Sequence, residues 1–304
     1  MDAILLFVTF LWGINPTIMK IGLVHIPPVP YNALRMFFAV ITSWIIVMVC
    51  GSYEKIERED FKKLFFISLF GFFIFQLCFT MGVNMTTAGN ASLILGTLPI
   101  TVALINKFLG TEKINYKMVL GIILSVFGVV LIIMGSNKAF GLSKNHIKGG
   151  MLLLIAQIAY GYFTVFSKEV AKKYSNSLVT AIIVSITAIL FTVVSFKSII
   201  STNWINIPIA GWLSNAYSGI FAICIGNVLW VFAVQKIGST KTSLYNNIQP
   251  IFAIITGYIV LGEPFGFIQF IGAITIFIGL YMTKRHKENN ELTNTDENMI
   301  KRRF

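Results

Sequence analysis

Amide and aromatic side chains lie within the long apolar stretches of this 304-residue chain, where unpaired polar groups are costly. A buried amide must pair with another side chain, with water or with a ligand. Aromatic rings can stack on a ligand or bind a cation. Hydrogen bonding between helices is the alternative for any single amide, but the set together predicts a polar binding cavity. The candidate binding residues are Trp12, Asn15, Gln76, Asn90, Gln157, Tyr160, Asn227, Trp230, Tyr245 and Asn246.

Three prolines inside or close to the same stretches predict helix breaks. Proline removes one backbone hydrogen bond and frees the carbonyl four residues earlier. Lipid cannot satisfy that carbonyl, so the break should face protein or a water-filled cavity. A kink that only aids packing is the alternative, but paired breaks in two related helices favour a binding site. The prolines are Pro16, Pro99 and Pro250, and the freed carbonyls belong to Trp12, Leu95 and Asn246.

Acidic residues are absent from the middle of every apolar stretch. Proton-coupled pumps usually carry an intramembrane carboxylate or histidine, so a carboxylate-driven antiport is not expected. The charged residues near predicted helix ends are interpreted as gate or helix-end elements, and they are Lys20, Arg35, Glu112 and Glu263. Lys20 and Arg35 either only extend to the outer membrane surface or attract a carboxylate at the outer mouth.

These residues are positioned by an integral membrane protein. Hydrophobic residues make up 56% of the chain and charged residues 12%, about half the share usual in soluble domains. A spanning helix needs about 20 apolar residues. The predicted spans are 3–23, 31–50, 64–82, 88–108, 117–135, 149–167, 178–196, 211–234, 242–261 and 266–283.

The ten spans form two copies of one unit. A proline, a glutamate and two glycines recur 151 positions later: Pro99, Glu112, Gly121 and Gly128 match Pro250, Glu263, Gly272 and Gly279. Because each copy has an odd number of helices, the second is inverted relative to the first, as in many secondary transporters. The glycine pairs predict close helix packing, either within the fold or in a homodimer. The predicted organisation is repeat 1–135, linker 136–148, repeat 149–283 and disordered tail 284–304.

The net charge of +12 reports topology rather than a nucleic-acid partner. Eighteen of the 24 lysines and arginines fall on one side if the N-terminus lies inside. The positive-inside rule therefore predicts a multi-pass protein with both termini in the cytoplasm. The three cysteines lack metal-type spacing, so neither a metal site nor a cofactor is expected.

Several motifs resemble the drug/metabolite transporter superfamily, specifically chains with two tandem EamA-type domains. The resemblance covers roughly residues 3–283. It is carried by FLWGINPTIMKIG, by ALRMFFA around Arg35, and by the Pro99–Glu112 and Pro250–Glu263 segments. The resemblance implies ten helices and a central cavity that the ten candidate binding residues line. The missing intramembrane carboxylate departs from the small cation exporters of this superfamily.

The sequence thus predicts a secondary transporter in the plasma membrane that works by alternating access. Its expected substrate is a small polar or zwitterionic, amino-acid-like metabolite, and export is the expected direction. Within transport, the alternative is an exporter of aromatic or cationic drugs. An enzyme acting on lipid-linked substrates or a receptor is less favoured, since the few candidate acid–base groups are scattered.

Overall fold

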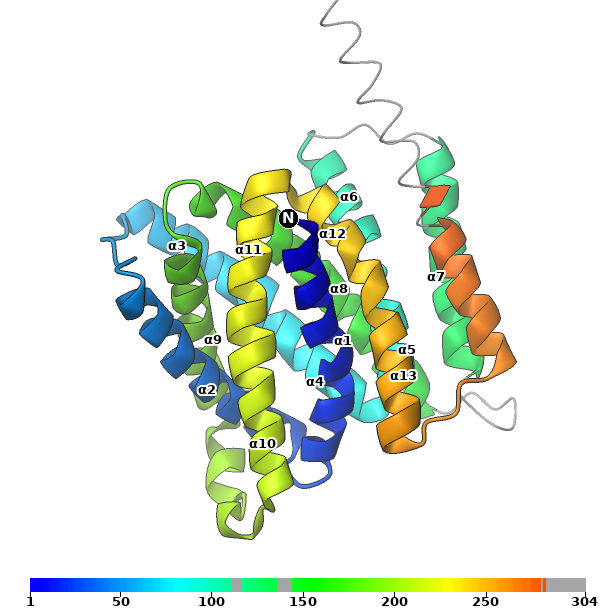
Figure 1. Cartoon of the computed structure of the whole chain (residues 1–304), viewed down its shortest axis with the longest axis horizontal. Helices are drawn as coiled ribbons and strands as arrows, with labels where there is room; N and C mark the ends of the chain where they lie inside the picture. The colour runs from blue at the N-terminus through cyan, green and yellow to red at the C-terminus, as the bar shows by residue number, and fades with distance from the viewer. Residues whose placement is uncertain (111–115, 136–143, 280, 283–304) are drawn as a thin grey trace, which may run out of the picture.

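In the part of the chain that the structure describes, helices form ten segments that cross the molecule (Figure 1). The computed structural model describes residues 1–110, 116–135, 144–279 and 281–282. The first half comprises α1 (Asp2–Leu23), α2 (Pro28–Val49), α3–η1–α4 (Arg58–Phe66, Ile67–Phe73, Ile74–Met85), α5–α6 (Ala88–Leu95, Leu98–Phe108) and α7 (Tyr116–Gly135). The second half comprises α8 (Lys144–Ala171), α9 (Asn176–Ser201), η2 (Trp204–Asn206), α10–η3–α11 (Ile209–Tyr217, Ser218–Ile225, Gly226–Ile237), α12–η4–α13 (Ser239–Leu244, Tyr245–Ile248, Gln249–Leu261) and a tenth spanning helix, Phe267–Gly279.

The lengths of nine of these segments fit a lipid bilayer, and the tenth, Phe267–Gly279, is shorter. Eight of them are long and apolar enough to cross a membrane, and α7 adds 20 residues. At about 1.5 Å per residue, about 20 residues span the hydrocarbon core. No strand occurs among the described residues. The predicted all-α membrane fold is confirmed, although α8 extends beyond both edges of the predicted span 149–167.

The two halves repeat their irregularities as well as their helices. The third and eighth spanning helices each contain a π-helical turn, η1 and η3, and these turns start 151 residues apart, at Ile67 and Ser218. The interruption between α5 and α6 corresponds to η4 at the same offset. Short π segments inside α-helices are frequent at functional sites. Here η1 ends three residues before Gln76 and η3 ends two residues before Asn227, both of them predicted amides.

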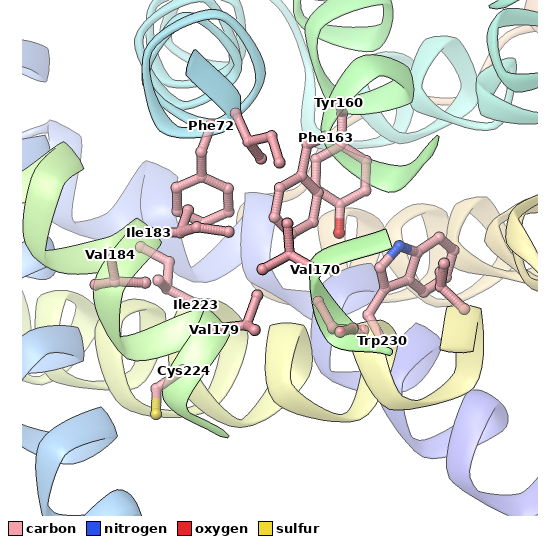
Figure 2. Close-up of a cluster of buried hydrophobic side chains, with 14 of the residues drawn as sticks. Phe72, Tyr160, Phe163, Val170, Val179, Ile183, Val184, Ile223, Cys224 and Trp230 are labelled. Atoms are coloured by element: carbon pink, nitrogen blue, oxygen red, sulfur yellow. The ribbon is translucent and has the colours of Figure 1, made fainter. Parts of the chain in front are cut away.

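The two repeats are interleaved rather than merely adjacent. Helix α4 packs along α8, α2 along α9 and α1 along α13, so each of these pairs takes one helix from each half. Buried side chains from both halves join in one large cluster, which includes Phe72 from η1 and Phe163 from α8 (Figure 2). Figure 2 also places Tyr160 and Trp230 in this cluster. The core therefore supports the wall of the cavity described below.

The glycine faces bring α7 and the tenth spanning helix together at one edge of the molecule (Figure 1). A Cβ built on Gly272 would lie 2.8 Å from the carbonyl oxygen of Gly128, and the converse distance is 2.7 Å. Only glycine permits this approach, since real Cβ contacts are longer. At least this pair of the predicted glycines packs within the fold.

Replacing Gly272 by valine is expected to force these two helices apart. Overpacking of this kind costs about 1–3 kcal/mol, so the melting temperature in detergent should fall. Ile274→Val, on the more exposed part of the same helix, serves as the control and should leave it nearly unchanged. An unchanged melting temperature for Gly272→Val would contradict the packing role.

Candidate functional site

A small cavity lies where the broken helices of the two repeats meet. Its volume is about 50 Å³, well below the roughly 300–1,000 Å³ of ordinary ligand pockets. The space holds only a few water molecules, so a metabolite could enter only if the helices moved. The lining residues are Trp12, Asn15, Arg35, Phe75, Gln76, Phe79, Leu95, Gln157, Tyr160, Ala222, Ile223, Asn227, Asn246 and Gln249.

Seven of the ten candidate binding residues line this cavity, and they come from both repeats. They are Trp12, Asn15, Gln76, Gln157, Tyr160, Asn227 and Asn246. Gln76 and Asn227, which are 151 residues apart in sequence, thus face the same space. Asn227 accepts a hydrogen bond from the Tyr160 hydroxyl at 3.1 Å and donates to the Ile223 carbonyl at 2.7 Å.

The other three candidates are not in the cavity lining. Asn90 lies in the first turn of α5, where its Oδ1 accepts from Gln269 Nε2 at 2.6 Å. Trp230 is fully buried behind Trp12, with ring centroids 4.9 Å apart. Tyr245 points away and donates its hydroxyl hydrogen to Asp2 at 2.6 Å. None of the three is among the residues that line this cavity, because periodicity alone does not fix which way a residue of a helix faces.

The breaks in the fourth and ninth spanning helices meet at the cavity. Helix α5 ends at Leu95 and α6 begins at Leu98, so Pro99 occupies the first turn of a new helix, as Pro250 does in α13. The Leu95 carbonyl accepts hydrogen bonds from the side chains of Gln157 and Asn246, the latter at 2.7 Å. The break in the ninth spanning helix is thus hydrogen-bonded to the break in the fourth. Helix α1 runs without interruption through Pro16, so the break predicted there is absent.

Arg35 is the main correction to the sequence-based site. It was placed at an outer helix end, but its side chain is completely buried and lines the cavity. Helix α2 begins at Pro28, which puts Arg35 two turns inside the helix. A proline at the first helical position is a start signal, and reading Pro28 that way would have shown this depth.

The guanidinium of Arg35 makes hydrogen bonds only to neutral groups. Among the described residues, no carboxylate lies within 4 Å of it. Its acceptors are Asn32 Oδ1 (2.7 Å, from Nε), Gln76 Oε1 (2.6 Å) and Thr80 Oγ1 (2.7 Å, both from Nη2), and Ser218 Oγ (3.2 Å) and Met19 Sδ (3.3 Å, both from Nη1). A buried charge without a counter-ion is energetically costly, which marks it as a functional candidate.

Asn15 contributes a polar atom without a partner. Its Nδ2 donates to Met19 Sδ at 3.3 Å, while its Oδ1 is buried and accepts no hydrogen bond. A thioether sulfur can only accept, so the amide nitrogen is the group that must face Met19. Asn15 lines the cavity, and its buried Oδ1 is left as an acceptor without a donor.

Aromatic rings form the apolar part of the wall. Tyr160 packs against Phe75 with centroids 4.5 Å apart and edge-on against Trp12 at 5.7 Å. Trp12 is itself held in place because its Nε1 donates to the Ala222 carbonyl in η3 at 2.8 Å. Phe75 and Phe79 line the same space, 5.4 Å apart, and were missed because apolar side chains in apolar helices give no signal in sequence.

A charged cluster lies at the end of the molecule where α1 ends and α5 begins. Gly262, with a left-handed φ of 62°, ends α13 and turns the chain, and Glu263 follows directly. The Glu263 carboxylate accepts from the backbone N–H of Ala88 at 2.8 and 3.0 Å and from that of Gly89 at 3.4 Å. Lys20 Nζ lies 3.3 Å from the same carboxylate. We call Lys20, Ala88, Gly89 and Glu263 the Glu263 cluster.

The Glu263 cluster joins the two repeats, since Lys20 and Ala88 belong to the first and Glu263 to the second. A carboxylate at the start of a helix is stabilised by free N–H groups and by the helix dipole. Glu112, the counterpart of Glu263, lies outside the described residues. No group of three potential metal-ligating side chains occurs within the described part of the chain.

Comparison with known proteins places this architecture in a family. The model of the EamA-like transporter family matches residues 1–134 and 147–285, so each repeat is matched separately. The chain also resembles a protein of known crystal structure with a TM-score of 0.69, over 93% of this chain and 97% of the other. At 16% identity, that likeness concerns the fold alone.

Curated relatives are similar to the chain over nearly their full length. The uncharacterized transporter YoaV of Bacillus subtilis (strain 168) is 25% identical over 277 residues, covering 90% of this chain and 93% of its own. A probable amino-acid metabolite efflux pump of Salmonella typhimurium is 25% identical over 286 residues, covering 91% and 92%.

Proposed function

Because the chain belongs to the EamA-like transporter family, we propose that it exports a small polar or zwitterionic, amino-acid-like metabolite by alternating access. The observation that carries the proposal is the cavity between the two repeats, to which each repeat contributes amides and a broken helix. A cavity lined by amides within apolar helices is what a transporter needs to bind a polar solute halfway across a membrane. The membrane is proposed to be the plasma membrane, with both termini in the cytoplasm.

Contacts between the repeats at the two ends of α1 support an alternating mechanism. At one end the Glu263 cluster holds the repeats together, and at the other Tyr245 of the second repeat contacts Asp2 of the first. Releasing one set while keeping the other would open the cavity to one side only. Such rigid-body motion of one repeat against the other is the usual form of alternating access in inverted-repeat transporters.

An amino-acid-like substrate is supported by the chemistry of the lining and by one relative. Amides and a carbonyl can hold an ammonium group, whereas buried Arg35 favours an anionic group and disfavours a cationic drug. The aromatic wall is the feature that favours the alternative, an aromatic drug. The similarity to the probable amino-acid metabolite efflux pump supports both the substrate class and export.

Counterflow in proteoliposomes tests the proposal. Purified protein is reconstituted, vesicles are loaded with one unlabelled amino acid at a time, and uptake of the same labelled amino acid is followed. Transient accumulation above equilibrium is expected for at least one amino acid and for no protein-free vesicle. Absence of accumulation across all twenty amino acids would contradict the proposed substrate class.

A further inference from the structure

Within the described part of the chain, a buried charge without a counter-ion and a buried acceptor without a donor lie side by side at the cavity. The Arg35 guanidinium carries a positive charge with no anion beside it among the described residues, and Asn15 Oδ1 is an acceptor with no donor. The two side chains are neighbours, since each donates to the same atom, Met19 Sδ, at 3.3 Å. The pair therefore presents a cation and an acceptor side by side.

Native structures rarely leave a buried acceptor such as Asn15 Oδ1 without a partner, or a buried charge such as Arg35 without a counter-ion, unless a ligand or water completes them. Arg35 is suited to bind a carboxylate, because its planar guanidinium is complementary to that group in charge and geometry. Asn15 Oδ1 can accept a hydrogen bond, and an ammonium group has three N–H donors. An α-amino acid is a small molecule that carries both groups on one carbon atom.

We propose that Arg35 and Asn15 form a clamp for the head group of an α-amino acid, which rests on the proposed function. The carboxylate binds Arg35 and the ammonium group donates to Asn15 Oδ1. The side chain of the substrate then faces the aromatic wall of Trp12, Phe75 and Tyr160. This arrangement selects for apolar or aromatic amino acids and requires both head-group charges.

The hydrogen bonds of Arg35 indicate where the carboxylate enters. Its contacts through Nε and Nη2 are 2.6–2.7 Å long, whereas the contacts through Nη1 are 3.2 Å to Ser218 and 3.3 Å to a sulfur atom. The Nη1 contacts are the weaker ones, so a carboxylate replaces them at least cost.

Ser218 is the partner of Arg35 that belongs to the second repeat, in η3. A carboxylate that captured Nη1 would remove this link between the repeats. Substrate binding would thereby weaken one contact that holds the closed state together. The clamp thus connects recognition to the rocking of the repeats.

Matched ligands test the clamp on the unaltered protein. Leucine is compared with isopentylamine, which lacks the carboxylate, and with 4-methylpentanoate, which lacks the ammonium group. Phenylalanine is compared in the same way with phenethylamine and 3-phenylpropanoate. Binding is measured by thermal shift and by inhibition of counterflow. For at least one of the two series, we expect the amino acid to bind about thirtyfold or more tightly than either analogue.

The outcomes separate the clamp from the transport function. Amines that compete as well as amino acids would overturn the carboxylate assignment to Arg35, and acids that compete equally would overturn the role of Asn15, while transport itself would stand. Failure of every amino acid to show counterflow would contradict the proposed function and the clamp together.

A substitution of Gln76 supplies an internal competitor for the carboxylate. Gln76 Oε1 lies 2.6 Å from Arg35 Nη2, so Gln76→Glu places a carboxylate on the guanidinium without changing the size of the side chain. We expect a higher melting temperature and amino-acid affinity reduced tenfold or more. A well-folded Gln76→Glu protein with unchanged affinity would overturn the assignment.

Removing the charge completes the series. Arg35→Gln should lose the preference for leucine over isopentylamine, provided that its elution profile shows a folded protein. If Arg35→Gln fails to fold, the matched ligands and Gln76→Glu still test the clamp. Retention of the full preference by folded Arg35→Gln would contradict the clamp.

Discussion

Transport is expected to fall by at least about a hundredfold when Gln76 and Asn227 are both replaced by leucine. Each repeat contributes one of these amides to the cavity, and each amide has a partner that the change leaves unpaired. Arg35 loses the acceptor 2.6 Å from its Nη2, and the Tyr160 hydroxyl loses the acceptor at 3.1 Å. An unpaired buried group costs about 1–3 kcal/mol, more when charged, so two losses of about 2 kcal/mol each exceed a factor of a hundred. Initial counterflow rate at equal reconstituted protein measures the effect.

The control for this double variant removes two buried polar groups outside the cavity. Asn215 and Thr187 are fully buried and each has a side-chain oxygen without a partner. The variant Asn215→Leu with Thr187→Val should insert normally into the membrane. Its counterflow rate should stay within about threefold of the original, because the residues that line the cavity are unchanged. If the double leucine variant were folded and retained the original rate, the cavity would not be the transport site.

The second large effect is expected at the Glu263 cluster. Glu263→Gln removes the charge that attracts Lys20 and the dipole of α5, while it keeps one acceptor for the N–H of Ala88. The lost interactions are together worth about 1–2 kcal/mol, which corresponds to a five- to thirtyfold shift in a two-state equilibrium. The population should shift toward the state that is open at this end.

Spin labels can measure this shift. Val24 and Phe267 are exposed near the cluster, one after α1 and one at the start of the tenth spanning helix. The distance distribution between labels there should gain a longer component in Glu263→Gln. Glu54→Gln makes the same charge change at an exposed residue elsewhere and should leave the distribution unaltered. An identical distribution for both variants would show that the cluster does not hold this end closed.

Most of the fold could be predicted from sequence because the membrane limits the choices. An apolar run of about 20 residues can only be a helix in lipid, so the spanning segments were found where expected, and 88–108 was found with its edges. Other edges differ because a helix can continue into polar residues beyond its apolar run, as α8 does through residues 144–148 and 168–171. The offset of 151 predicted the duplication, and the odd number of helices in each copy predicted the inversion. No residue type indicated the π-helical turns η1 and η3.

The site was only partly predictable, because the sequence does not fix which neighbour a helical residue faces or how deep in the membrane it lies. Paired prolines led to the meeting of Leu95 with Asn246, because a freed carbonyl in lipid needs a donor. Trp230 and Tyr245 were misplaced because a polar or aromatic residue in a helix gives no indication of which neighbour it faces. Arg35 was misplaced because charge alone suggested a membrane surface, whereas five neutral acceptors from several helices keep it buried.

The central claim is that one cavity opens in turn to the two sides of the membrane. A single cysteine in its wall tests this directly, at Ala222, in a protein whose Cys50, Cys78 and Cys224 are replaced by alanine. Labelling with a membrane-impermeant maleimide is measured in right-side-out and in inverted vesicles. We expect labelling from either side, slowed by a transported amino acid, and shifted toward one side by Glu263→Gln. Labelling from one side alone, in every variant and condition, would contradict alternating access.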